Sequence, residues 1–132
     1  MIREILIEKK LVAILIKSKS YKNKKGINFF TKTKYPFQVA SMQHKKNHII
    51  NPHIHKNYTR KINNTSEVLI IQSGEIEVNF YNKKKIVKKI SLKKDDIIIF
   101  FTGSHGFKIK KNSRFIEVKQ GPYNKKIDKI LI

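Results

Sequence analysis

The segment Glu75-Ile-Glu-Val-Asn-Phe80 alternates strictly between polar and apolar residues, and this pattern decides the fold class. Side chains of a β-strand point alternately to its two faces, so Ile76, Val78 and Phe80 share one face and the polar residues share the other. We therefore expect a strand with one buried face and one face that is wet or lines a site.

Short segments of this kind recur along the chain. They alternate or are wholly apolar, and turn-forming residues separate most of them, which is typical of an all-β sandwich or barrel. No segment of useful length has helical periodicity. The sequence predicts strands over 3–7, 11–17, 27–31, 37–44, 48–53, 67–72, 75–81, 85–91, 96–101, 106–110 and 114–119, with turns at 22–26, 45–47, 73–74, 82–84, 93–95 and 111–113.

The segment Ile97-Ile-Ile-Phe-Phe101 is apolar on both faces. A strand of this kind is covered on each side, by a second sheet or by a partner subunit. We therefore expect a homodimer.

Length and composition favour one domain over residues 1–132, with the strands of residues 1–36 packed on a barrel. The chain has no cysteine, so any metal ion must be bound by nitrogen and oxygen ligands. The longest N-terminal apolar run, residues 11–16, is shorter than the about 20 residues that cross a bilayer. This favours a cytoplasmic protein with no membrane partner.

The net charge of +21 suggests a nucleic-acid partner, because clustered cations bind phosphates by releasing counterions. However, only Arg3, Arg60 and Arg114 of the 30 basic residues are arginines, and the lysines are spread from Lys9 to Lys129. Lysine, isoleucine and asparagine are the residues of AT-rich codons. The lysines also lack the interleaved aromatic residues on which single strands stack. We expect salt-sensitive, nonspecific adsorption to polyanions and no specific nucleic-acid partner.

Pro52-His53-Ile54-His55 is the sharpest local indication of chemistry. On a strand, a spacing of two projects both imidazoles from one face, close enough to share a metal ion. Glu67 begins an expected strand that ends at Gly74, and His105 lies in the expected turn Gly103-Ser-His-Gly106. Plainer interpretations stay open: surface histidines, a carboxylate paired with a lysine, and a turn histidine in solvent.

These residues resemble the two motifs of the cupin family. The first motif reads His-x-His, a short gap, Glu and then Gly, which His53, His55, Glu67 and Gly74 match. The second motif reads Gly-Asp, an apolar strand, Pro-x-Gly and His. Here Asp95-Asp96, residues 97–101, Gly103 and His105 take those places.

Two features depart from the motifs. The gap between His55 and Glu67 holds eleven residues, which is longer than usual and makes Glu67 the least secure of the expected ligands. Thr102 stands where the second motif has proline, and Asp95 stands where it has glycine. These changes alter the turn but leave its histidine in place.

The resemblance covers residues 37–123 and implies a cupin double-stranded β-helix, which is a jelly-roll barrel. It implies one divalent transition metal inside one mouth, bound by His53, His55, Glu67 and His105. Three imidazoles and a carboxylate suit Fe, Mn, Ni, Zn or Cu. The segment from Asn51 to Tyr123 also looks like a group of small bacterial cupins and, more distantly, the sugar-nucleotide ketoisomerases.

Three functions follow from this resemblance. The first is a metal-dependent enzyme or binding protein for a small polar, anionic metabolite such as a sugar derivative. The second is a metal-free ketoisomerase of dTDP-sugar type, in which His53 and His55 act as acid and base. The third is a non-catalytic ligand-binding or regulatory barrel.

Three further residues are candidates for the ligand-binding site at the mouth of the expected barrel. Arg60 would bind a carboxylate or phosphate of the ligand through its guanidinium group, or would order the loop by a salt bridge. Tyr123 would offer a phenol at the mouth, or would be a packed aromatic residue. Glu117, on the last expected strand, is placed to face the barrel.

Overall fold

The computed structural model describes all 132 residues, and nearly all of its regular secondary structure is β-strand. All strand pairs are antiparallel, so the all-β prediction is confirmed. No helix of the chain has the length and apolar character needed to cross a membrane. The elements are β1 (Ile2–Ile7), β2 (Lys10–Ile16), the 3-10 helix η1 (Ser18–Ser20), β3 (Gly26–Phe29), β4 (Ala40–Gln43), β5 (Glu67–Asn82), β6 (Lys85–Lys93), β7 (Ile97–Phe100) and β8 (Ser104–Lys119).

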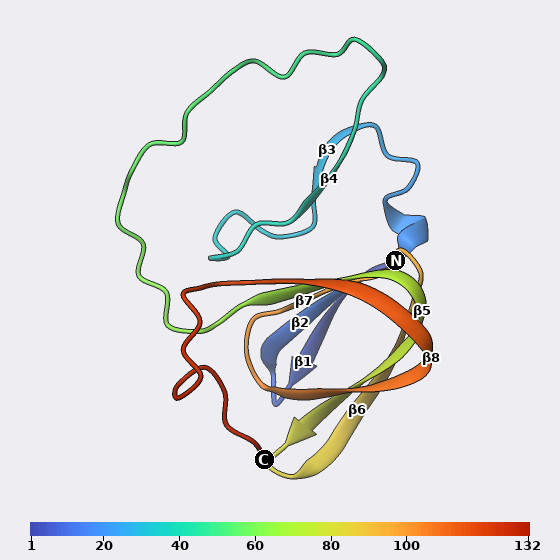
Figure 1. The fold of residues 1–132 in the computed structure, drawn as a ribbon, viewed down its shortest axis with the longest axis vertical. Coiled ribbons are helices and arrows are strands. Elements are labelled where there is room, and N and C mark those ends of the chain that lie inside the picture. The colour runs from blue at the N-terminus through green and yellow to red at the C-terminus, as the bar shows by residue number, and fades with distance from the viewer.

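One sheet contains six of the strands, in the order β1-β2-β7-β5-β6, with β8 paired to β5. The first part of β5, Glu67–Ile70, pairs with β7, whereas its later part, Glu75–Asn82, pairs with β6. β8 follows β5 through both parts. The long strands β5 and β8 therefore curve from one half of the sheet into the other, and β3 and β4 form a separate small sheet beside the first half (Figure 1).

The paired strands do not close into the barrel that the sequence suggests, because β1 and β6 remain the ends of the main path. The strand predicted over 48–53 is wrong: residues 44–66 contain no strand and run as a wide loop away from the sheet (Figure 1). Pro52 has no backbone N–H to donate to a strand ladder. Ile49 and Ile50 are exposed, so no packing partner holds this segment extended.

The turns predicted at 73–74 and 111–113 are also wrong, because the chain does not reverse at either place. Both segments lie inside long strands, β5 and β8, and face each other across them. The register shifts there between Ile71 and Ser73 and again between Ser73 and Glu75. Gly74 has φ +83°, a conformation that glycine adopts readily and that here makes a bulge within a strand.

Two apolar clusters lie on opposite faces of β2 and β7. The inner cluster fills the space between the two halves of the sheet, and the outer cluster lies under the segment that carries β3 and β4. The inner cluster comprises Ile5, Val12, Ala13, Leu15, Leu69, Ile71, Ile76, Val78, Phe80, Ile90, Leu92, Ile98 and Phe100. The outer cluster comprises Ile14, Ile16, Phe30, Val68, Ile97, Ile99 and Phe101.

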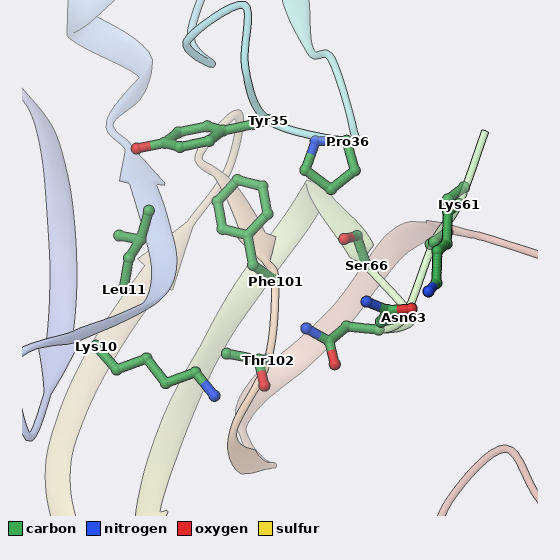
Figure 2. A pocket seen from close by; sticks show the side chains of 11 residues that line it. Lys10, Leu11, Tyr35, Pro36, Lys61, Asn63, Ser66, Phe101 and Thr102 are labelled. Carbon is green, nitrogen blue, oxygen red and sulfur yellow. The ribbon is translucent and has the colours of Figure 1, made fainter.

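These clusters explain the doubly apolar segment 97–101 within a single chain. Ile98 and Phe100 pack into the inner cluster, while Ile97, Ile99 and Phe101 pack into the outer one. No second copy is needed to cover β7, and the homodimer stays a prediction. Beside the outer cluster lies a cavity of about 310 Å³, which Tyr35 and Phe101 border on one side (Figure 2).

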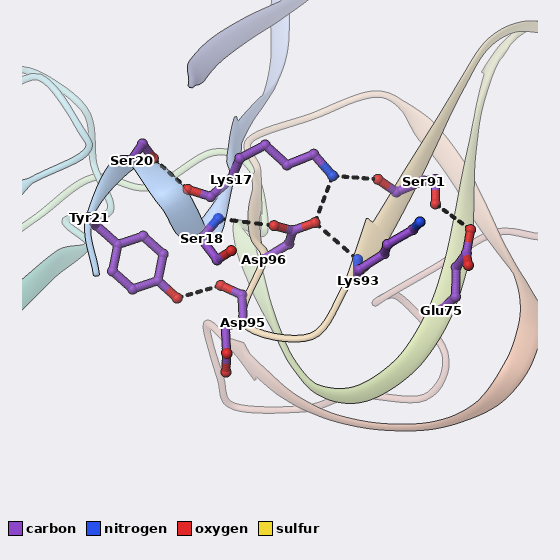
Figure 3. Close-up of polar contacts among 9 residues, drawn as sticks. All are labelled: Lys17, Ser18, Ser20, Tyr21, Glu75, Ser91, Lys93, Asp95 and Asp96. Carbon is purple, nitrogen blue, oxygen red and sulfur yellow. Dashed lines mark hydrogen bonds and ion pairs between the residues drawn. The ribbon is translucent and has the colours of Figure 1, made fainter. Parts of the chain in front are cut away.

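Asp96 ties three segments together below the core. Its side chain is almost fully buried and accepts hydrogen bonds from the Lys17 ammonium group at 2.6 Å, the Ser18 N–H at 3.0 Å and the Lys93 N–H at 2.9 Å (Figure 3). The turn predicted at 93–95 is confirmed, and the Asp96 N–H closes it on the Lys93 carbonyl oxygen at 2.9 Å.

Asp96→Ala is expected to lower the free energy of unfolding by about 3 kcal/mol, because it leaves two partly buried N–H donors without an acceptor and removes the partner of a partly buried ammonium group. Urea denaturation followed by circular dichroism measures the change. Asp95→Asn is the matched control: it removes only an exposed pair with Lys22, so about 0 to 1 kcal/mol is expected. Equal losses in both variants would contradict the structural role of Asp96.

Candidate functional site

Glu67 and His105 lie in direct contact at one end of the inner cluster. Glu67 begins β5, and His105 is the second residue of β8. The His105 Nε2 atom contacts the Glu67 Oε1 atom. The link between them is Phe100, which pairs with Glu67 in the β-ladder and stacks on the His105 ring at 4.1 Å between centroids. Strand pairing and an aromatic stack therefore place the imidazole against the carboxylate.

Each nitrogen of His105 has an acceptor. Nε2 faces the Glu67 carboxylate, and Nδ1 lies 3.3 Å from the carbonyl oxygen of Gly103. These two contacts fix the orientation of the ring.

The pair is mostly enclosed but still reached by solvent. The His105 and Glu67 side chains are 20% and 16% exposed. Phe107, the next residue on the same face of β8, lies 5.5 Å from His105 between ring centroids and is itself exposed. Aromatic rings thus flank the imidazole on two sides, and a small part of it stays exposed to solvent.

Glu117 joins this pair from β8. Its strand partner is Leu69, which shares a face with Glu67, so the two carboxyl groups are neighbours across the strands. The hydrogen bond with His105 holds the pKa of Glu67 below its ordinary value. The hydrogen bond with Glu67 raises the pKa of Glu117, because a second negative charge beside the first is unfavourable. One carboxyl group is thus favoured as the anion and the other as the acid.

Lys119 is a site residue that the sequence analysis missed. It is the strand partner of Glu67, and its charge adds to the lowering of the Glu67 pKa. Its ammonium group lies 3.8 Å from the Asp128 carboxylate and 4.9 Å from the centre of the Tyr123 ring. Lys119 is two residues after Glu117, so the sequence already placed both on one face of the last strand. The chain has so many lysines that this spacing gave no reason to select Lys119.

His53 and His55 do not join Glu67 and His105 in this structure. Both are exposed in the loop 44–66, with ring centroids 5.1 Å apart. His53 Nδ1 lies 2.9 Å from the carbonyl oxygen of Asn51. No group of three His, Cys, Asp or Glu side chains stands ready to bind a metal ion. The chemistry of the four predicted ligands fits a transition metal, whereas the fold assembles only two of them.

Arg60 and Tyr123 lie in different places. The Arg60 guanidinium group stacks on the ring of Tyr58 at 3.6 Å within the exposed loop, and it forms no ion pair with a carboxylate. Tyr123 is 59% exposed, beside Lys119, so it lies at the edge of the Glu67 site. Of the two predicted ligand-binding residues, only Tyr123 is positioned next to the pair.

No protein-family profile matches the chain, and neither a curated protein nor a solved structure is significantly similar to it.

Proposed function

We propose that the chain is a metal-binding cupin that acts on or binds a small polar, anionic metabolite such as a sugar derivative. The observation that carries this proposal is the contact between Glu67 and His105. These two residues come from the two separate stretches that resemble the cupin motifs, and β5 and β8 bring them together at one end of the inner cluster.

In this proposal, His53 and His55 supply the remaining ligands when the loop 44–66 closes over the pair. Apolar surface on both sides supports closure: Ile49 and Ile54 of the loop are 76% and 90% exposed, and Phe107 beside His105 is 39% exposed. Closing the loop would remove these side chains from water, which is favourable in proportion to the apolar area buried.

The positive charge that loop closure would gather around the pair favours an anionic ligand. Lys119 lies at the site itself, and the loop that carries His53 and His55 also carries Lys56 and Arg60. When bound, a divalent metal with four protein ligands would offer its open positions to a ligand as a Lewis acid.

Metal analysis tests the proposal. Protein purified without chelator is expected to contain about one transition-metal ion per chain, since one set of four nitrogen and oxygen ligands is available. Elemental analysis gives the stoichiometry. Glu67→Gln, which keeps the size of the side chain but loses the anionic ligand, is expected to reduce the metal content. A metal-free chain that also fails to take up added Fe, Mn, Ni or Zn would contradict metal binding.

The metal-free alternative keeps a specific observation in its favour. Glu67 and His105 already form a carboxylate–imidazole pair, and a carboxylate that orients an imidazole is the usual arrangement of a general acid–base catalyst. In this alternative the acid–base residue is His105 rather than His53 or His55. A metal-free chain that still isomerises a keto sugar nucleotide, and loses this activity in His105→Ala, would establish it.

A further inference from the structure

The cavity beside the outer cluster is a second candidate binding site. It is bordered by the start of β2, the segment between β3 and β4, the end of the loop 44–66 and the residues that follow β7 (Figure 2). Ser66 lines it, whereas Glu67, the next residue, belongs to the site described above. Successive residues of an extended chain point to opposite faces, so the two sites lie on opposite sides of the start of β5.

The lysine, asparagine and threonine side chains that line the cavity have no protein partner. Lys10 and Lys61 line it, neither belongs to any ion pair of the chain, and no Asp or Glu lines it. Asn63 and Thr102 add an amide and a hydroxyl group. In Figure 2, Lys10 lies beside Thr102 on one side of this space, and Asn63 lies with Lys61 on the other. Two uncompensated cations with neutral donors beside them are the chemistry that binds phosphate.

Ser66 carries an independent indication of a ligand. The residue is 1% exposed, and its hydroxyl oxygen has no hydrogen-bond partner. Its backbone is fully used: the Ser66 N–H donates to Gln120 Oε1 at 2.9 Å, and the Ser66 carbonyl oxygen accepts from the Gln120 N–H at 3.3 Å. A buried hydroxyl without a partner is unfavourable. Its oxygen is enclosed in this structure, so the side chain must turn to another χ1 rotamer to meet an acceptor in the cavity.

The opposite side of the cavity is apolar. Leu11, Tyr35 and Phe101 form it, with the two aromatic rings 5.1 Å apart. This side would cover the uncharged part of a ligand. The volume of about 310 Å³ lies at the lower end of the range for small-molecule sites.

We propose that this cavity binds a small phosphate monoester of about the size of a hexose phosphate, whose phosphate group is held by Lys10, Lys61, Ser66 and Thr102. This site is separate from the Glu67–His105 pair, but both use the loop 44–66, because Lys61 lies in that loop and lines the cavity. Phosphate titration of the protein without added metal tests the cavity apart from the proposed metal-dependent function.

Titration of the isotope-labelled protein with inorganic phosphate, glucose 6-phosphate and glucose tests the site. At about 0.15 M salt, where exposed charges are screened beyond about 8 Å, both phosphates are expected to shift the amide signals of Lys10, Leu11, Ser66 and Thr102 to saturation. Glucose is expected to leave them unchanged. Shifts spread over lysines throughout the chain, without saturation, would overturn the proposal.

Matched charge variants separate this site from the general charge of the protein. Lys10→Gln with Lys61→Gln is expected to weaken phosphate binding at least about tenfold, because charge-assisted hydrogen bonds are lost. Lys84→Gln with Lys94→Gln removes the same charge from two exposed turns and is expected to change affinity less than about twofold. Equal weakening in the two double variants would overturn the proposal.

Ser66→Ala gives a readout that a purely structural role would not produce. The hydroxyl has no partner without ligand, so the midpoint of thermal unfolding is expected to stay the same or rise. The affinity for phosphate is expected to fall about threefold to tenfold, because one hydrogen bond to a charged group is lost. Unchanged affinity would remove Ser66 from the site and contradict the proposal.

Discussion

Replacing Gly74 with alanine is expected to lower the free energy of unfolding by about 3 kcal/mol or more, through backbone strain and overpacking together. Gly74 has φ +83°, and a Cβ atom there would lie 2.2 Å from the Asn112 carbonyl oxygen and 2.6 Å from the Ser113 Cα atom. Both are backbone atoms of β8 and cannot rotate away. Alanine would therefore push β5 and β8 apart at the bulge where both strands bend.

Gly26→Ala is the matched control for this effect. Gly26 has φ +75°, but nothing lies within 4 Å of the position that its Cβ atom would take. It shares the strain of the left-handed conformation without the clash, so a loss of about 1 kcal/mol is expected. Urea denaturation of both variants isolates the cost of the close approach. Similar losses at the two glycines would show that β5 and β8 do not pack so closely at Gly74.

The buried face of β5 could be predicted because its pattern is local. Alternation from Glu75 to Phe80 places Ile76, Val78 and Phe80 on one face, and all three are buried in the inner cluster. The period of two is a property of every extended chain, and it needs no knowledge of distant residues. The same reasoning explains why the strands of the sheet were found with few errors.

The glycine at 74 shows where local reasoning fails. Ser-Gly between two alternating segments is typical of a turn, and glycine with positive φ serves equally well in a turn and in a bulge. The choice depends on Asn112 and Ser113 of β8, which meet Gly74 across the sheet. Ser113 Oγ also accepts a hydrogen bond from the Glu75 N–H at 3.0 Å. These partners are remote in the sequence, so no local pattern could identify them.

The two candidate sites also differ in whether a sequence pattern could identify them. Glu67 and His105 were selected by motif order, and the fold places them in contact. The cavity with Lys10 and Ser66 has no motif, because separate segments each contribute one or a few side chains. The loop 44–66 was the hardest part to predict from the sequence. A His-x-His pair shares one face only if the chain is extended and paired there.

Replacing both His53 and His55 with alanine is expected to weaken metal binding at least about a hundredfold. Mutation of a residue that only hydrogen-bonds to a metal ligand already lowers metal affinity about 10- to 100-fold. Calorimetric titration of stripped protein with Zn²⁺ measures the affinity. The circular dichroism of the sheet is expected to stay unchanged, because both residues are exposed in a segment without strands.

His44→Ala with His48→Ala is the matched control for that experiment. This pair is also exposed, its rings stack at 4.1 Å, and its loss removes the same number of imidazoles. Unchanged affinity in this control, with strong loss in the His53 and His55 variant, would mean that the loop brings one particular pair to the metal. If both double variants retain full affinity, the loop histidines are not ligands. The metal would then depend on residues beside Glu67 and His105, with Glu117 as the nearest further carboxylate.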